Sequence, residues 1–329
     1  MPFYSPVSVS GYHIREAGST AAQELAFTLN SGFTYIEASL KRGLKIDDFA
    51  HRLSFFFNSH MDFFEEIGKY RAARRIWANK LKNEYGAKNE NSLKLKFHTQ
   101  TAGCSLTAQQ PENNIVRTAY EAMAAVLGGT NSLHTNSLDE TLALPSEKAA
   151  KIALRTQQIL AHETGVPNVA DPLGGSWYVE QITDRIEEEA NEYFRVIKNL
   201  GGTITAIEDG YFQKKISESA SVYQESIDSK ERIIVGLNDF VDENEKLEIE
   251  ILKISQQAQE IQEKKVKKLR KKRDNKSLDK KMKKLRNACE NNLNLVPYLI
   301  EVAECGGTVG EIVELMKGVY GEWEESFGI

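Results

Sequence analysis

The sequence has 329 residues, of which 41% are hydrophobic and 27% charged, so the chain can bury a core and is not disordered as a whole. A formal net charge of −5 argues against nucleic acid as the main partner. The sequence contains no apolar run near the roughly eighteen residues of a membrane helix, no signal-peptide pattern at the N-terminus, and three cysteines too widely spaced for a disulfide framework or zinc knuckle. We therefore expect a cytoplasmic protein with no nucleic-acid or membrane partner and no metal site.

The first half of the sequence alternates strand-like and helix-like segments. The stretch "LKLKFHTQT" alternates with period two, whereas "NNIVRTAYEAMAAVL" has helical spacing and ends at a glycine pair. The pattern predicts, in chain order, a strand over 6–14, helices over 19–32, 45–60 and 63–86, a strand over 93–103, a helix over 113–129, a strand over 130–137 and a helix over 146–165. This order predicts an α/β fold with three parallel strands joined by helical crossovers.

The second half is predicted to be mainly helical. The pattern predicts a loop over 166–180, helices over 181–200 and 203–222, a strand over 231–240 and a highly charged helix over about 246–289. Residues 264–286 carry a local charge of +12, which is typical of a phosphate- or RNA-binding arm. The alternative is a solvated helix that packs through a narrow apolar stripe, and the lack of interleaved aromatic residues favours it. That stripe consists of Val266, Leu269, Leu278, Met282 and Leu285.

Motifs for several enzyme classes are missing from the sequence. The six histidines form no H-x-x-x-H or H-E-x-x-H pair, and there is no G-x-S-x-G, phosphate-binding loop or G-x-G-x-x-G. Instead, polar residues gather where predicted strands end. Such clusters converge on the active site in an α/β barrel, although they could also simply cap the crossover helices. The clusters are Tyr12, His13 and Glu16; His98, Thr99, Gln100, Thr101 and Gly103; and Asn131, Ser132, His134, Asn136 and Ser137.

Four segments carry a resemblance to a known family. "SVSGYHIREAGSTAAQELAFTL", "RLSFFFNSHMDFFEEIGKYRAARRIWA", "HTQTAGCSLTAQQPENNIVRTAYEAMAAVLGGTNSLHTNSLDETLALPSE" and "ETGVPNVADPLGGSWYVE" occur in this order. They resemble the catalytic large subunit of methylmalonyl-CoA mutase and other adenosylcobalamin-dependent acyl-CoA mutases. The resemblance implies the C-terminal portion, about three βα units, of a (β/α)8 barrel. Residues 1–165 would form strands six to eight with their helices, and residues 166–329 a mainly helical extension.

The resemblance also implies roles for the acyl-CoA site. His13 would hydrogen-bond the thioester carbonyl and stabilise charge on that oxygen while the acyl group migrates. Tyr12 would help to exclude water from the radical site. Arg52 and Ser54 match positions that hold the coenzyme A arm, and an arginine suits its phosphates. The positions that would reach the pantetheine amides are Asn131, where the family usually has Gln, and Ser132.

Adenosylcobalamin is the implied cofactor. By the resemblance, Glu16, Gly103, Glu140 and Ala143 would line the corrin ring, and Gln100 would lie near the adenosyl group or the corrin edge. Carboxylates can accept hydrogen bonds from corrin amides, and a glycine allows the backbone to approach closely. Glu16 and Glu140 could otherwise be ordinary charges at helix N-termini.

Two parts of the family pattern are missing from this sequence. The D-x-H-x-x-G motif of the cobalamin domain does not occur, and by the resemblance the sequence would start where the family enters its sixth strand. We therefore expect one part of a split radical mutase that isomerises a coenzyme A thioester. Its partners would be a chain with the first barrel strands and a cobalamin-binding domain or small subunit. The substrate could be methylmalonyl-, isobutyryl-, 2-hydroxyisobutyryl- or ethylmalonyl-CoA. Alternatives are a non-catalytic truncated or scaffolding fragment and an autonomous coenzyme A-binding module.

Overall fold

The computed structural model describes residues 4–5, 7–242, 249, 252 and 255–324. It divides into two compact units, Met1–Leu252 and Lys253–Ile329. This division lies well beyond residue 165, where the sequence analysis placed the end of the barrel portion. No helix in the described part of the chain is long and apolar enough to cross a membrane.

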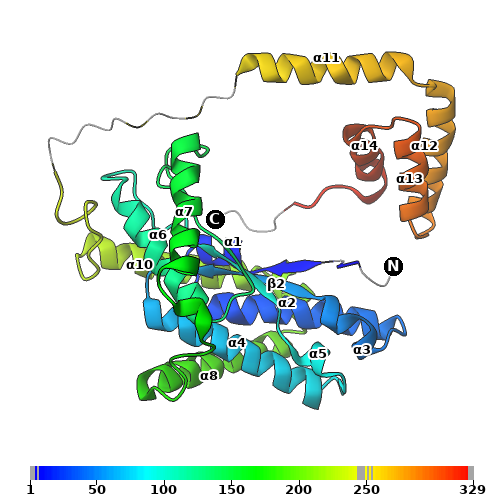
Figure 1. Ribbon diagram of the computed structural model, residues 1–329. Coiled ribbons are helices and arrows are strands. Elements are labelled where there is room, and N and C mark those ends of the chain that lie inside the picture. The colour runs from blue at the N-terminus through cyan, green and yellow to red at the C-terminus, as the bar shows by residue number, and fades with distance from the viewer. Residues whose placement is uncertain (1–3, 6, 243–248, 250–251, 253–254, 325–329) are drawn as a thin grey trace. The chain divides into compact units, whose positions relative to one another are not determined.

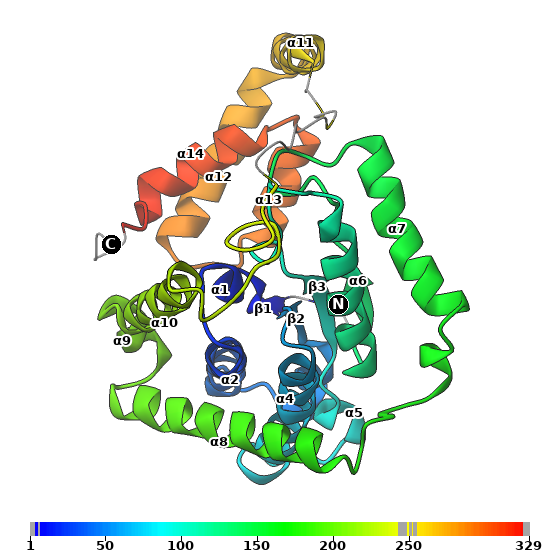
Figure 2. The same cartoon turned by 90° about the vertical axis from the view of Figure 1, so that its left-hand side faces the viewer.

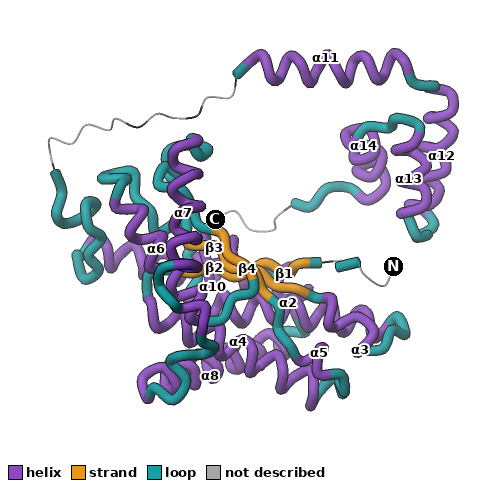
Figure 3. Tube along the Cα trace, in the orientation of Figure 1, coloured by secondary structure: helices purple, strands orange, loops and turns teal. Residues whose placement is uncertain are grey.

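The first unit is built on a parallel four-stranded sheet with strand order β1-β2-β3-β4 (Figure 3). Its strands are β1 (Ser8–Ser10), β2 (Ser54–Ser59), β3 (Phe97–Thr101) and β4 (Ser132–His134). Helical segments connect consecutive strands, so the predicted α/β fold with parallel strands and helical crossovers is confirmed.

Helices cover one face of this sheet in two layers. Figure 2 shows α2 and α4 between the strands and α8, with α6 beside α4. The described helical elements of this unit are α1 (Tyr12–Glu16), α2 (Ala21–Lys41), α3 (Ile46–Phe49), η1 (Ala50–Arg52), α4 (Phe63–Asn83), α5 (Glu90–Leu93), α6 (Asn113–Leu127), α7 (Glu147–His162), η2 (Val166–Asn168), α8 (Trp177–Asn199), α9 (Thr203–Glu208) and α10 (Tyr211–Asp228).

The core of the first unit lies between the sheet and these helices. Phe55, Phe57 and Phe97 project from the strands, and Trp77 and Tyr70 of α4 pack among them; all five are at most 2% exposed. Burial of such aromatic side chains supplies much of the hydrophobic free energy that holds helix and sheet layers together.

The expectation of only three strands is wrong, because residues 54–59 form a strand where the sequence predicted the helix over 45–60. Only the short α3 and η1 occupy the first part of that range. Phe55 and Phe57 point into the core, whereas Phe56 lies on the other face and stacks on Tyr12 with ring centroids 5.1 Å apart. Because both faces are apolar at this point, three consecutive phenylalanines conceal the period of two.

A second error concerns the end of the helix predicted over 19–32. The helix begins as expected, with a capping box between Thr20 and Gln23, but α2 continues past Gly32 to Lys41. At Gly32 an added Cβ would lie 2.8 Å from the ring of Phe55. The glycine therefore permits close packing of helix and strand and does not end the helix.

Other elements differ from the prediction in smaller ways. Residues 231–240 form no strand, only an isolated bridge between Val235 and Asp239. The helix predicted over 203–222 is divided into α9 and α10, because Gly210 between them adopts a φ of 70°.

The second unit contains α11 (Gln256–Lys272), α12 (Asn275–Glu290), α13 (Val296–Glu304) and α14 (Val309–Tyr320) (Figure 1). The basic segment forms two helices instead of one, because Arg273 turns away to pair with Glu311 and Asp274 caps α12. Residues 246–248, 250–251 and 253–254 of the predicted helix lie outside the described residues. Of the predicted stripe, Leu278 and Leu285 are buried and Met282 packs against them, whereas Leu269 is exposed.

Candidate functional site

The two faces of the sheet differ in chemistry. Alternate strand residues point to opposite faces, and the face away from the core is mostly polar. The parallel register aligns these side chains in rows across the strands. The residues of this polar face are Ser8, Ser10, Ser54, Phe56, His98, Gln100, Ser132 and His134, all half-buried or exposed.

At the carboxyl edge of the sheet, the structure brings together Tyr12 and Gln100. The Gln100 side-chain amide donates to the Tyr12 hydroxyl at 3.0 Å and to Oδ1 of Asn136 at 2.8 Å. Asn136 is itself held, since its Nδ2 donates to the Thr101 carbonyl at 2.9 Å. Burial, with the nearby Glu16 carboxylate, raises the pKa of Tyr12. The Tyr12 hydroxyl therefore stays protonated and can both donate and accept hydrogen bonds.

Glu16 connects three segments at the same edge. Its Oε1 accepts hydrogen bonds from Nδ2 of Asn58 at 2.7 Å and from the Gly103 N–H at 2.9 Å. Its Oε2 accepts from the Cys104 N–H at 2.9 Å. An added Cβ at Gly103 would lie 2.9 Å from Glu16 Oε2, so this close approach needs a glycine. We call the three hydrogen bonds from Asn58, Gly103 and Cys104 to Glu16 the carboxylate clamp.

His13 lies on the same short helix as Tyr12 and Glu16. Its side chain is exposed, and its Nδ1 lies 3.3 Å from the Ser10 hydroxyl, which projects from the polar face. The helix α1 begins directly after β1, and the Gly11 N–H donates to the Phe56 carbonyl at 2.7 Å, which joins this turn to β2. His13 is therefore presented at the carboxyl edge with its Nε2 side open.

The predicted coenzyme A contacts lie at the opposite end of the strands. Arg52 ends η1 two residues before Ser54, which is the first residue of β2. Asn131 precedes β4, and its Oδ1 accepts from the Phe97 N–H at 2.9 Å. Ser132 starts β4 and its hydroxyl lies 2.7 Å from Nδ1 of His98. The amide oxygen of Asn131 is thus already engaged with the chain, which the sequence could not indicate.

Glu140 and Ala143 lie in the loop that follows β4. The Glu140 N–H donates to the Ser137 carbonyl and the Ala143 N–H to the Asp139 carbonyl, so both belong to one series of turns. Glu140 is exposed, yet partial burial of its carboxyl, with Glu16 and Asp139 nearby, raises its pKa. Because the side chain is exposed, it can still reach a hydrogen-bond donor on an incoming group.

Two further histidines lie on the polar face. Burial lowers the pKa of His98 and of His134, so both imidazoles are neutral near pH 7. In the described residues there is no group of three or more His, Cys, Asp or Glu side chains that could hold a metal ion. The polar face therefore offers neutral hydrogen-bonding groups along its length.

The sequence analysis missed Asn58 as a site residue and left Asn136 unassigned. Asn136 belonged to a polar cluster at a strand end, which was a usable signal. Asn58 was concealed by the helix wrongly predicted over 45–60, because only a strand ending at Ser59 brings its side chain to the carboxyl edge.

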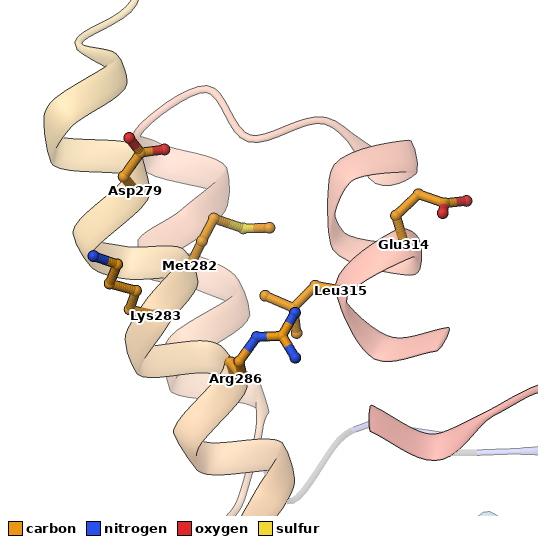
Figure 4. Close-up of a pocket in the computed structure, with 6 residues that line it drawn as sticks. All are labelled: Asp279, Met282, Lys283, Arg286, Glu314 and Leu315. Carbon is orange, nitrogen blue, oxygen red and sulfur yellow. The ribbon is translucent and has the colours of Figure 1, made fainter. Parts of the chain in front are cut away.

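A separate pocket lies in the second unit, between α12 and α14 (Figure 4). It contains none of the site residues predicted from the sequence. Its lining combines apolar and oppositely charged side chains, namely Asp279, Met282, Lys283, Arg286, Glu314 and Leu315. The candidate site is therefore assigned to the sheet of the first unit.

Comparison with known proteins supports the resemblance. The family model described as methylmalonyl-CoA mutase matches residues 1–322. The chain is 44% identical over 324 residues to the 2-hydroxyisobutanoyl-CoA mutase large subunit of Aquincola tertiaricarbonis, covering 98% of this chain and 58% of that protein. It is 45% identical over 325 residues to the methylmalonyl-CoA mutase of Rhizobium meliloti, covering 98% and 45%.

The human mitochondrial methylmalonyl-CoA mutase is 44% identical over 324 residues, with coverage of 98% of this chain and 43% of the relative. The chain thus spans about half the length of these curated relatives. The match extends over nearly the whole chain and includes every residue of the candidate site. The chain belongs to the methylmalonyl-CoA mutase family.

Proposed function

We propose that this chain supplies one wall of the active site of an acyl-CoA mutase. The observation that carries the proposal is the mostly polar face of the sheet, which is interrupted by Phe56. It runs from Ser54 and Ser132 at one end of the strands to Tyr12 and His13 at the other. A parallel sheet whose face away from the described helices is mostly polar suits a barrel lumen, because open parallel sheets normally have both faces covered.

The barrel itself is part of this proposal. If β4 is the last strand of a (β/α)8 barrel, the four strands correspond to strands five to eight, not six to eight. The remaining strands would come from the part of the relatives that this chain does not cover, whichever chain carries it. The open edges of β1 and β4 are the places where those strands would pair.

The acyl-CoA substrate would extend along the polar face. Arg52 and Ser54 lie at the entry end, and the six residues of β2 span about 20 Å at the usual rise of a strand. Asn131 and Ser132 would face the pantetheine arm, with Asn131 offering its Nδ2 because its oxygen is engaged by Phe97. This arrangement would leave the thioester near His13, whose imidazole can donate to the carbonyl oxygen.

The carboxyl edge would hold adenosylcobalamin. The fit rests on this chain's own geometry: Gly103 has no side chain where a Cβ would meet Glu16 Oε2 at 2.9 Å, so the Glu16 carboxylate lies directly against its backbone, and Glu140 offers an exposed carboxylate. Gln100 and Ala143 complete the edge, and Tyr12 would exclude water from it. When bound, adenosylcobalamin would supply radical chemistry at this edge. The chain's residues would bind, orient and shield the reacting groups.

The test is an assembly of this chain with the part of a relative that it does not cover and with a cobalamin-binding chain. Isomerisation would be assayed with methylmalonyl-, isobutyryl-, 2-hydroxyisobutyryl- and ethylmalonyl-CoA, with and without adenosylcobalamin. Isomerisation of one of these thioesters that requires the cofactor is the expected result. An assembly that forms but isomerises none of the four would contradict the proposal.

His13 provides the sharpest variant of this test. Loss of an oxyanion-stabilising donor typically lowers kcat by about 10²–10³-fold, and we expect this of His13→Ala with little change in KM. His162→Ala is the control, since His162 is exposed at the end of α7 and takes no part in the site. An unchanged kcat in His13→Ala would remove His13 from the mechanism.

A further inference from the structure

A buried ion pair lies directly behind the candidate site. Lys69 of α4 and Glu24 of α2 are both 0% exposed, and Nζ of Lys69 lies 2.6 Å from Oε2 of Glu24. Nζ also pairs with Glu66, one helical turn away. Burial raises the pKa of Glu24, and the Lys69 ammonium opposes this shift. A pair this deeply buried gives little net stability, because the desolvation cost offsets the attraction between the charges.

Both members of the pair hold the backbone of Asn58. Oε1 of Glu24 accepts from the Asn58 N–H at 2.6 Å, and Nζ of Lys69 donates to the Asn58 carbonyl at 2.8 Å. The Tyr70 hydroxyl donates to the same carbonyl at 2.5 Å. Every backbone polar atom of Asn58 is therefore engaged by a side chain from a helix.

The reason lies in the lengths of the strands. The Phe56 carbonyl accepts from the Gly11 N–H on the β1 side of β2, whereas the Ser59 carbonyl accepts from the Ala102 N–H on the β3 side. Because the backbone groups of successive strand residues point to alternate sides, those of Asn58 point toward the β1 side. However, β1 ends at Ser10, opposite Phe56, so no strand continues there to pair with Asn58. The ion pair replaces the missing strand and prevents unsatisfied backbone groups in the interior.

The side chain of Asn58 connects this buried assembly to the site. Its Nδ2 donates to Oε1 of Glu16, the carboxylate that also accepts from the Gly103 and Cys104 N–H groups. The contacts thus run without a gap from the Glu24–Lys69 pair through Asn58 to the carboxylate clamp. The clamp in turn fixes α1 against the loop after β3.

We infer that Asn58, held by the Glu24–Lys69 pair, is a positioning residue that sets the carboxylate of Glu16 and the backbone at Gly103 for the cofactor. The inference rests on the proposed function, because it assigns these residues to the cofactor side of that site. Residues that touch neither substrate nor cofactor would thus hold the carboxyl edge from behind.

The variant that tests this is Asn58→Ala, which removes the donor to Glu16 and keeps the backbone contacts. The matched control is Ser59→Ala. Ser59 is the next residue, is equally buried, and donates to the Glu121 carbonyl at 2.7 Å, away from Glu16. Amide hydrogen exchange in the full assembled chain would be followed by mass spectrometry on a peptide that contains Gly103 and Cys104.

We expect the exchange of these two amides to accelerate about tenfold in Asn58→Ala and to stay unchanged in Ser59→Ala, since one hydrogen bond to a charged group is lost. Unchanged protection in Asn58→Ala would overturn the inference. Should Asn58→Ala fail to fold, Asn58→Leu keeps the volume of the side chain, removes the same donor to Glu16 and is read in the same way.

The second readout separates positioning from simple stability. The Kd for adenosylcobalamin, followed by visible absorption, should rise about tenfold in Asn58→Ala, while KM for the acyl-CoA changes less than about twofold. Faster exchange with an unchanged Kd would overturn the inference, because the clamp would then serve the fold alone. If the unmodified assembly bound no adenosylcobalamin, the proposed function itself would fail, whatever the exchange data show.

Discussion

The two faces of the four-stranded sheet differ in burial and in polarity. On one face Phe55, Phe57 and Phe97 are at most 2% exposed and pack against α2 and α4. On the other, hydroxyl, imidazole and amide groups are half-buried or exposed and are aligned by the strand register. The helices hold the sheet through its apolar face, so the residues of the other face are not needed for that packing and can serve binding.

Paired substitutions on β2 should give the largest contrast between the faces. Phe57→Ala removes a ring that is 0% exposed and contacts Tyr70 and Phe97, so we expect it to lower the free energy of unfolding by about 3–5 kcal/mol. Phe56→Ala removes a half-buried ring on the polar face and should cost about 1–2 kcal/mol. Urea denaturation of both variants measures this, and equal losses would show that the faces are not energetically distinct.

A buried histidine and a histidine of the polar face should respond differently to pH. His60 is buried and directly follows β2, and its Nδ1 accepts a hydrogen bond from the Met61 N–H. Burial, with Arg15, Lys69 and Arg232 nearby, lowers its pKa to about 3. Because the native pKa lies below the unfolded value near 6.5, protonation of His60 favours the unfolded chain. The free energy of unfolding is therefore not lowered by His60 above about pH 6.5, and it falls as the pH decreases from there toward 3.

The measurement is the free energy of unfolding at pH 7 and pH 5 for the unmodified chain and for His60→Gln. We expect the unmodified chain to lose about 2 kcal/mol more than the variant over this interval. His134→Gln, on the polar face, is the control and should keep most of the pH dependence. A pH dependence that persists in full in His60→Gln would assign it to other groups.

The smallest effect on stability is expected at Ser10, on the polar face. Ser10→Ala should change the free energy of unfolding by less than about 0.5 kcal/mol, as for most surface substitutions. It removes the hydroxyl 3.3 Å from Nδ1 of His13, so in an active assembly kcat should fall about two- to tenfold. A large loss of stability with unchanged kcat would reverse the roles that we assign to the two faces.

The parts of the fold that local pattern encodes were predictable from the sequence. The parallel βα order, the start of α2 at its Thr20 cap and the strand containing Gln100 all follow from spacing and capping. Strand β2 was not predictable in this way, because Phe56 is apolar on the polar face and hides the alternation. With that strand missed, Asn58 could not be placed.

The candidate site was predictable mainly where residues follow strands directly. Tyr12, Glu16, Gln100 and Gly103 were expected at the carboxyl edge by resemblance, and the structure brings them together there. The carboxylate clamp was not predictable, since Asn58 and Gly103 lie 42 and 87 positions from Glu16 and no local pattern encodes that contact. The same holds for the hydrogen bond between Asn131 and Phe97.

The shortness of α1 has a consequence for when the site comes into existence. A helix of five residues is far below the length that is stable alone in water, so α1 cannot hold its shape before its neighbours are in place. Its anchors are the Phe56 carbonyl at one end and the carboxylate clamp at the other. We therefore expect α1, and His13 with it, to take its place late in folding, after β2 and β3 have paired, and the same turn to be the first to open in local unfolding.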